Sequence, residues 1–376
     1  MYFTFDAANH VLYSIVAKVS ISLFGDSEFA LRLPSVAAGF FLMLGVGRIL
    51  EHVESRPARW LAFAAIGLHP LLLDFSVAAR GYGMSLAFLA WAISASMNER
   101  PSLAALLLGF AVSANFTAAF AAVGLIAATF LLSEGSWKRR LGSMVGMSLL
   151  AALPVLATCA GILPLLSGER FYAGYPALSD SVLNLIGTSI YMARRAGLFG
   201  TFAAAQFIEF GFLHAVGLFL AISALLAWRR GARQDLIPVL TLALAGIAVL
   251  VAHYLKGMYY PVDRTGLWLV LLFSLAWALA AGNMKNRLPL AVNLALAAAF
   301  AIQFATQFET DYFAVWRYDR SMKEIAHRME NEIRGKPPGS ISIGANWIHQ
   351  PSLEYYRVHD KVAALRPAER NENGRR

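Results

Sequence analysis

The sequence predicts an all-α polytopic membrane protein with about ten transmembrane helices. Three observations indicate this fold class. First, 58% of the 376 residues are hydrophobic, whereas a soluble domain is roughly 45–50% apolar. Second, only 15% of the residues are charged, against about 25% in soluble domains, and the mean hydropathy is +0.56. Third, the apolar residues gather in runs that approach the ~20 residues needed to cross a bilayer as a helix.

Ten apolar runs qualify as candidate spans. In chain order they cover 35–50, 59–75, 81–97, 102–114, 117–133, 141–162, 206–228, 236–254, 265–281 and 288–305. The fourth and fifth runs are short, and only the segment SANFT at 113–117 divides them. These two runs are therefore predicted to form either two short spans or a re-entrant pair.

The distribution of basic residues predicts the orientation. Cytoplasmic connections of membrane proteins are rich in Lys and Arg. One set of connections carries Arg48, Arg56, Arg59, Arg100, Lys138, Arg139, Arg140, Arg229, Arg230, Arg233, Lys285 and Arg287. The opposite set is longer and carries fewer basic residues. We therefore expect a membrane protein whose N- and C-termini both lie on the external side, in the periplasm or the exterior.

The first 34 residues are predicted to form an external loop that contains an interfacial helix. Its apolar residues fall on one helical face. They are Val11, Leu12, Ile15, Val16, Val19, Leu23 and Phe24. The chain begins without a basic region or a cleavage site of the kind found in signal peptides. We expect either that the first apolar hairpin carries this segment across the membrane or that the chain lacks an upstream helix, and we favour the second.

The remaining chain is predicted to comprise a transmembrane domain and two C-terminal pieces. The domain covers 35–305 and includes an external loop at 163–205. Residues 306–366 are expected to form a small external α/β segment, in which the helical spacing of Ile325, Met329 and Ile333 ends at the breaker KPPG and the alternating SISIGA follows. The polar composition of 367–376 predicts a disordered tail.

Polar and ionisable residues near the membrane are candidates for function, because placing them there costs free energy. Four clusters lie on the predicted external face. They are Asp6, Asn9 and His10; Asp26, Glu28 and Arg32; His69, Asp74, Arg80 and Tyr82; and Lys256, Tyr259, Tyr260, Asp263 and Arg264. Each cluster also has a purely structural interpretation. These are a solvated loop, a helix start, an Arg whose stem lies in the interface, and an aromatic belt, respectively.

The clusters suggest roles in chemistry on an anionic lipid. Asp6 and His10 are the candidate catalytic residues, since an external Asp can act as a general base. Arg80 with Tyr82 forms one candidate phosphate-binding group, because the planar guanidinium matches two phosphate oxygens. Tyr259, Lys256 and Arg264 form a second.

Several other function classes find no support in the sequence. The net charge of +9 arises from the connections between apolar runs, so we expect a lipid bilayer and no nucleic acid as a partner. No metal-ligand spacing, glycine-rich phosphate loop or nucleophile elbow is present, and no metal or cofactor is predicted. The single cysteine, Cys159, lies in an apolar run and is interpreted as a core residue.

The segment FGDSEFALRLPS carries a resemblance to a known family. Its matching residues are Phe24, Gly25, Ser27, Glu28, Arg32, Leu33, Pro34 and Ser35, joined by Arg80 and Tyr82 and more loosely by Pro261 and Arg264. With these residues the chain resembles the GT-C glycosyltransferases of the dolichyl-phosphate-mannose–protein mannosyltransferase type, which include the bacterial enzymes that transfer aminoarabinose to lipid A. The sequence departs from the pattern of this family in two places. The family's first span and its acidic pair do not precede Met1, and NHVL stands where Pro-Pro is usual.

The resemblance implies a membrane glycosyltransferase that lies in the bacterial inner (plasma) membrane, with both termini of this chain in the periplasm. Such an enzyme would transfer a sugar from a polyprenyl-phosphate donor to a glycan, lipid or protein acceptor on the external face. It implies that Arg80 and Arg264 stabilise the phosphate and that Asp6 serves as the base. Two alternatives remain: a transporter or flippase, for which Glu209 and His214 would be the relevant residues, and a catalytically inactive scaffold.

Overall fold

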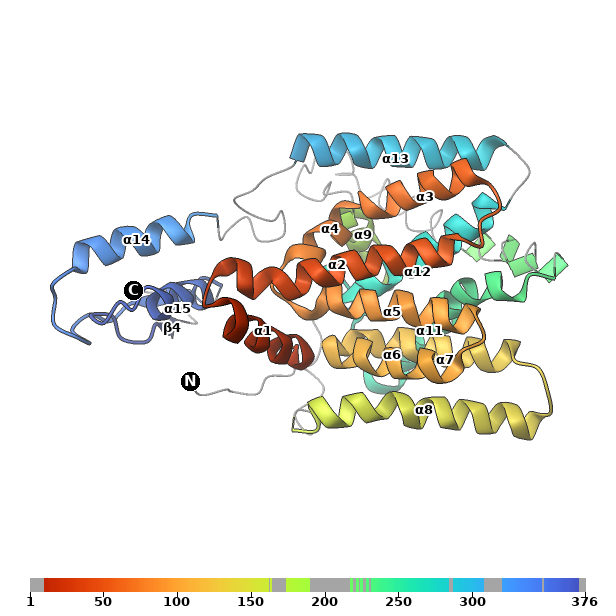
Figure 1. Cartoon of the computed structure of the whole chain (residues 1–376), viewed down its shortest axis with the longest axis horizontal. Helices are drawn as coiled ribbons and strands as arrows, with labels where there is room; N and C mark the ends of the chain where they lie inside the picture. The colour runs from red at the N-terminus through yellow and green to blue at the C-terminus, as the bar shows by residue number, and fades with distance from the viewer. Residues whose placement is uncertain are drawn as a thin grey trace. The chain divides into compact units, whose positions relative to one another are not determined.

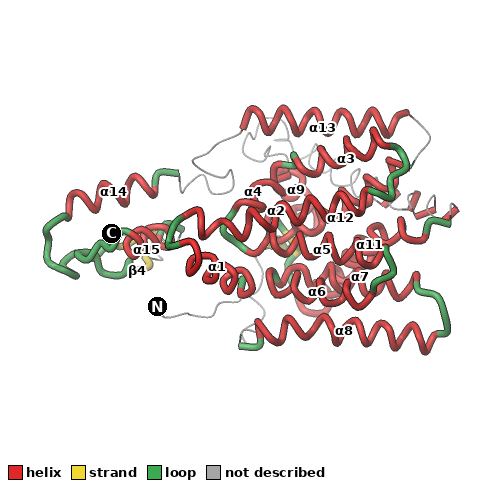
Figure 2. Tube along the Cα trace, viewed as in Figure 1, coloured by secondary structure: helices red, strands yellow, loops and turns green. Residues whose placement is uncertain are grey.

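A computed structural model describes residues 10–161, 163, 174–189, 217–218, 221–222, 224–225, 228–229, 231–283, 287–307, 320–346 and 348–371 (Figure 1). The chain divides into two compact units, residues 1–307 and 308–376. The first unit is a bundle of apolar helices. The second is a small unit with two helices and one pair of short strands among its described residues. Figure 2 shows that helix predominates in the described chain.

The bundle confirms the mostly helical, apolar architecture that composition predicts. Its described helices are α1 (Val11–Phe24), α2 (Glu28–Leu50), α3 (Arg56–Gly67), α4 (Pro70–Val77), α5 (Gly81–Met97), α6 (Pro101–Ala114), α7 (Ala119–Leu132), α8 (Trp137–Cys159), α9 (Leu178–Ser189), α11 (Leu236–Lys256), α12 (Leu267–Gly282) and α13 (Arg287–Gln307). Within the described residues, four helices are long and apolar enough to cross a membrane, and the bent pair α3–α4 could form a fifth span. The total number of spans stays a prediction, because most of the predicted span 206–228 lies outside the described residues.

The predicted span 59–75 is divided into two helices. Helices α3 and α4 meet at an angle of 57°. Pro70 causes the break, because it has no N–H to continue a helix and disfavours helical geometry in the residue before it. His69 accordingly has extended backbone angles, and Pro70 occupies the first turn of α4, where the missing N–H is tolerated.

Helix α2 starts earlier than the predicted span and is tied to α1. The Ser27 hydroxyl accepts a hydrogen bond from the Ala30 N–H at 3.1 Å and caps the helix. Pro34 lies inside α2 and cannot donate to the carbonyl of Ala30. The Ser20 hydroxyl of α1 donates to that carbonyl at 2.6 Å instead, and the Tyr13 hydroxyl donates to the carbonyl of Leu31 at 2.6 Å.

Small residues allow the helices of the bundle to approach closely. Helices α2, α5, α6 and α8 pack successively, and α7 packs on α11 (Figure 1). A Cβ at Gly109 of α6 would lie 2.3 Å from the carbonyl oxygen of Ala151 in α8. A Cβ at Gly124 of α7 would lie 2.5 Å from the carbonyl oxygen of Thr241 in α11. Close backbone contact of this kind is how helices associate where water supplies no hydrophobic driving force.

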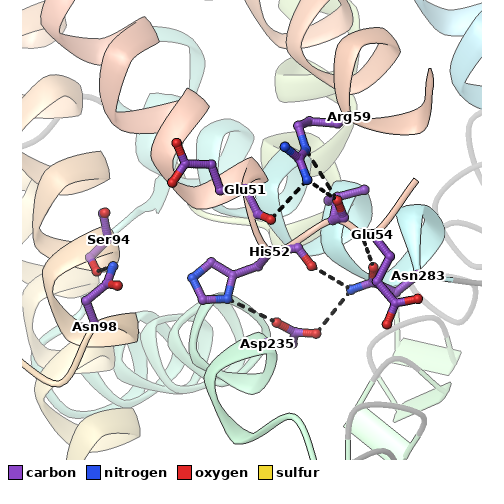
Figure 3. A network of polar contacts seen from close by, with 9 residues as sticks. Glu51, His52, Glu54, Arg59, Ser94, Asn98, Asp235 and Asn283 are labelled. Carbon is purple, nitrogen blue, oxygen red and sulfur yellow. Dashed lines mark hydrogen bonds and ion pairs between the residues drawn. The ribbon is translucent and has the colours of Figure 1, made fainter. Parts of the chain in front are cut away.

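A polar network joins the helix ends that carry the basic connections (Figure 3). The Asn283 amide nitrogen donates to the carboxylate of Asp235 at 3.1 Å and to the carbonyl of His52 at 3.3 Å. Its amide oxygen accepts from the N–H of Glu54 at 3.0 Å, and the Arg59 guanidinium donates to the carbonyl of Val53. The end of α12 and the start of α11 are thus fixed to the α2–α3 connection.

The second unit contains α14 (Met322–Ile333), β3 (Gly344–Asn346), α15 (Gln350–His359) and β4 (Glu369–Asn371). Strand β3 pairs in parallel with β4, and an isolated bridge joins Ile341 to Leu365. The prediction that 367–376 is disordered is therefore wrong for 369–371. Composition missed this strand because its backbone hydrogen bonds are made to β3, and such pairing depends little on the polarity of the side chains.

Candidate functional site

Three segments that are far apart in the sequence meet at one end of the bundle. They are the start of α1, the start of α5, and the connection from α11 to α12. This connection contains the short strand β2 (Tyr260–Pro261) and the 3-10 turn η6 (Asp263–Gly266). All three belong to helix ends opposite those joined by the Asn283 network. The side chains they bring together are those of His10, Arg80, Tyr82 and Arg264.

Arg80 is held by its backbone. It precedes the first residue of α5 in extended geometry, with φ −147° and ψ 160°. The hydroxyl of Ser35, a fully buried residue of α2, donates to the carbonyl of Ala78 at 2.5 Å and lies 3.3 Å from the carbonyl of Arg80. The segment between α4 and α5 is therefore attached to α2, which fixes the point from which the Arg80 side chain extends.

His10 is fixed in one tautomer. Its Nδ1 lies 2.9 Å from the carbonyl oxygen of Ala114, which can only accept, so Nδ1 carries the proton and Nε2 carries the lone pair. The ring packs edge-on against Tyr82 with 4.5 Å between ring centroids, and Tyr82 in turn packs against Phe75 at 5.0 Å. These contacts place a neutral hydrogen-bond acceptor beside the tyrosine.

Arg264, which lies in the connection between α11 and α12, extends toward His10 and Tyr82. Its side chain lies near that of Tyr82. The charges of Arg264 and Arg80 both act on His10 and on Tyr82, and the carboxylate of Asp263 also acts on Tyr82. Two guanidinium groups thus lie around one phenol and one imidazole, which is an arrangement suited to binding an anion with several oxygens.

Comparison with known proteins gives matches among solved structures. No protein-family model matches the sequence, and no curated protein matches it. The oligosaccharyltransferase of Archaeoglobus fulgidus in complex with Zn and sulfate has a TM-score of 0.46 and 14% identity, with 96% of this chain and 54% of that chain covered. ArnT from Cupriavidus metallidurans bound to undecaprenyl phosphate has a TM-score of 0.42 and 14% identity, with 96% of this chain and 66% of that chain covered. Both are GT-C glycosyltransferases. This chain spans between half and two thirds of their length.

Three of the predicted site residues are exposed or lie outside the described residues. Asp6 lies outside the described residues. Lys256 at the end of α11 and Tyr259 are exposed, and Tyr260 of the same predicted group is buried and stacked on His253 with 4.3 Å between ring centroids. The group at 256–264 is therefore divided between the cluster, which Arg264 joins, and the surface.

The sequence gives little or no indication that several other residues belong to the site. Ser35 lies in the motif that the sequence analysis singled out, but its role as a backbone anchor requires knowing that α2 packs on the α4–α5 connection. Phe75 was one apolar residue among many. Asp263 belongs to the fourth sequence cluster, in which its residue type alone indicates no role. Among the described residues, no group of three or more His, Cys, Asp and Glu side chains could hold a metal ion.

The environment of His10 lowers its pKa from 6.5 to about 4. Burial of the ring contributes most, and the positive charges of Arg80 and Arg264 also lower the pKa, while the hydrogen bond to the Ala114 carbonyl raises it. The ring is therefore neutral at pH 7. This residue precedes α1 and lies outside the spans.

We expect folding stability to decrease as the pH falls from about 6.5 to about 4. In this window the unfolded state takes up a proton at His10 and the folded state does not, so stability is fully present above 6.5 and declines below it by on the order of 1–3 kcal/mol. Thermal unfolding in detergent between pH 7.5 and pH 4 measures this. The variant His10→Asn keeps a donor for the Ala114 carbonyl and does not titrate, so its dependence on pH should be weaker. Equal slopes in the two proteins would contradict the assignment.

Proposed function

We propose that this protein is a membrane glycosyltransferase that transfers a sugar from a polyprenyl-phosphate donor to a glycan, lipid or protein acceptor. The observation that carries the proposal is that the positive charges of Arg80 and Arg264 both act on His10 and Tyr82, at one end of an apolar helical bundle. By the distribution of basic residues, this end faces the periplasm of a bacterial inner membrane.

The charge of the site supports a phosphate ligand. Arginine is always ionised and presents planar pairs of N–H donors that match two oxygens of a phosphate. During transfer the lipid phosphate is the leaving group, and negative charge develops on the oxygen that leaves the sugar. Two fixed cations stabilise that charge most strongly where water is partly excluded, which lowers the barrier to reaction.

The surface beside the site supports a lipid carrier. Helix α1 buries Tyr13, Ala17 and Ser20 against the bundle and exposes Ile15 and Val19. The side chains of Ile15 and Val19 therefore point away from the protein, as expected of a helix that lies in the membrane interface. A prenyl chain attached to the bound phosphate would meet an apolar environment here. Lys256 and Tyr259, which are exposed on the same connection as Arg264, would contact the head group at the rim.

The proposed reaction is a substitution at the anomeric carbon. The acceptor oxygen or nitrogen forms a bond to this carbon, the bond from the carbon to the phosphate oxygen breaks, and its electron pair leaves with the lipid phosphate. The acceptor proton passes to a base, for which we propose Asp6. His10 has a lone pair on Nε2 and would accept a hydrogen bond that orients the acceptor.

The experiment uses the full chain reconstituted in lipid nanodiscs. We expect undecaprenyl phosphate to bind, undecaprenol to bind much more weakly because it lacks the anionic group, and a radiolabelled polyprenyl-phosphate sugar to be consumed when an acceptor fraction is added. Equal affinity for the phosphate and the alcohol would exclude a phosphate site at Arg80 and Arg264. Transport of the lipid across the bilayer without loss of sugar would favour a flippase instead.

A further inference from the structure

The turn that carries Arg264 contains a backbone conformation that its residue types do not favour. Asp263, the residue before Arg264, has a φ of 45°, in the left-handed region that residues other than glycine rarely adopt. Within the turn, the Thr265 hydroxyl is bonded to both the N–H and the carbonyl of Val262, at 2.8 Å and 2.6 Å. These bonds close the turn locally, but they do not attach it to the rest of the bundle.

Helix α9 supplies that attachment. The Asn184 amide oxygen accepts a hydrogen bond from the Asp263 N–H at 2.7 Å. The hydroxyl of Ser181, which is buried, donates to the carbonyl of Pro261 at 2.5 Å. One helix that lies about 80 positions earlier in the chain therefore binds the backbone on both sides of Val262, and no local sequence pattern indicates this.

Two further contacts hold α9 and the turn together. Strand β1 (Gly174–Tyr175), just before α9, pairs antiparallel with β2, so that Gly174 faces Pro261 and Tyr175 faces Tyr260. A Cβ at Gly266 would lie 2.3 Å from a methyl carbon of Leu185, so the turn packs closely against this side chain of α9. The turn is thus clamped by a strand pair, two side-chain hydrogen bonds and one close packing contact.

We propose that Asn184 and Ser181 are positioning residues for Arg264, so that α9 sets the affinity of the site for a lipid phosphate without contacting the phosphate. This inference rests on the proposed function, because it assumes that Arg264 binds the donor. Its physical basis is that the left-handed Asp263 backbone persists only if its N–H keeps its acceptor. Without that acceptor the turn relaxes, and the guanidinium moves away from Tyr82.

The test compares two substitutions at one position. Asn184→Leu has nearly the same volume and lacks the acceptor oxygen, whereas Asn184→Asp keeps it. We expect Asn184→Leu to raise the Kd for undecaprenyl phosphate roughly five- to tenfold, the loss typical of one hydrogen bond, and Asn184→Asp to stay close to the wild type. Asn98→Leu, the same change at the opposite end of the bundle, should leave the Kd unchanged.

A double-mutant cycle separates positioning from general damage. If Asn184 acts through Arg264, then Asn184→Leu should add nothing to the loss already caused by Arg264→Ala. Additive losses would mean that Asn184 supports the fold as a whole, and they would overturn the proposal. Equal weakening of binding by Asn184→Leu and Asn184→Asp would also overturn the proposal.

Amide hydrogen exchange of residues 258–266 gives a readout that does not depend on the donor. Faster exchange in Asn184→Leu than in Asn184→Asp supports the clamp, and unchanged exchange overturns it, whether or not any lipid binds. If exchange responds as expected but the wild type does not bind undecaprenyl phosphate, the proposed function fails, and with it the role of the clamp in phosphate affinity.

Discussion

Replacing Arg80 with alanine is expected to reduce glycosyl transfer at least ~100-fold, the cost typical of removing one fixed group that stabilises charge in a transition state. The loss should appear in both the affinity for the donor phosphate and the rate of transfer, because negative charge is present on the donor and increases as the bond to the sugar breaks. Turnover of a labelled polyprenyl-phosphate sugar by the reconstituted protein measures it.

The variant Arg80→Lys separates the contribution of the two parallel N–H donors of the guanidinium from that of its positive charge. Lysine keeps the positive charge but cannot present two parallel donors to two oxygens, so its activity should lie between that of the wild type and that of Arg80→Ala. Arg48→Ala is the matched control. Arg48 lies in the last turn of α2, at the end of the bundle opposite the candidate site. It is well exposed and pairs with Glu51, so its loss should leave transfer unchanged. Full activity in Arg80→Ala would rule out the role that we assign to Arg80.

Replacing Gly81 with alanine is expected to disrupt both the fold and the site. The new Cβ would lie 2.1 Å from the carbonyl oxygen of Ala114 and 2.9 Å from Cβ of His10. Neither backbone can yield without moving α5 away from the end of α6. Such a shift breaks the hydrogen bond between His10 and Ala114 and displaces Arg80 and Tyr82. We expect a loss of about 1–3 kcal/mol in stability, together with the loss of donor binding.

Gly246→Ala provides the matched control for this prediction. Gly246 lies inside α11, and nothing is within 4 Å of the position that its Cβ would take. Alanine favours a helix interior over glycine by roughly 0.5–1 kcal/mol, so this change should leave stability unaltered or raise it. Thermal unfolding and undecaprenyl phosphate binding, measured on both variants, test whether Gly81→Ala lowers stability and donor binding while Gly246→Ala does not. Wild-type binding by Gly81→Ala would mean that the contact of α5 with His10 is not needed by the site.

The extent to which the sequence predicted the site differs among its residues. Arg80 and Tyr82 stood out because a charged residue and a tyrosine interrupt an apolar run, and such residues are costly in a membrane. His10 stood out in the same way. Lys256 and Tyr259 belong to the same predicted cluster as Arg264, yet both are exposed in the structure. Sequence spacing could not separate these cases.

The sequence by itself determined the class of protein and the placement of most of its helices. Hydrophobic runs, prolines and capping residues act within a few positions of themselves, so their consequences can be predicted locally, as at Pro70 and Ser27. The tertiary structure alone decided that His10 meets Tyr82 and that Asn184 holds Asp263. Contacts of this kind depend on close approach of helices at small residues such as Gly81, and the hydrophobic pattern of a single helix does not specify which neighbour it approaches.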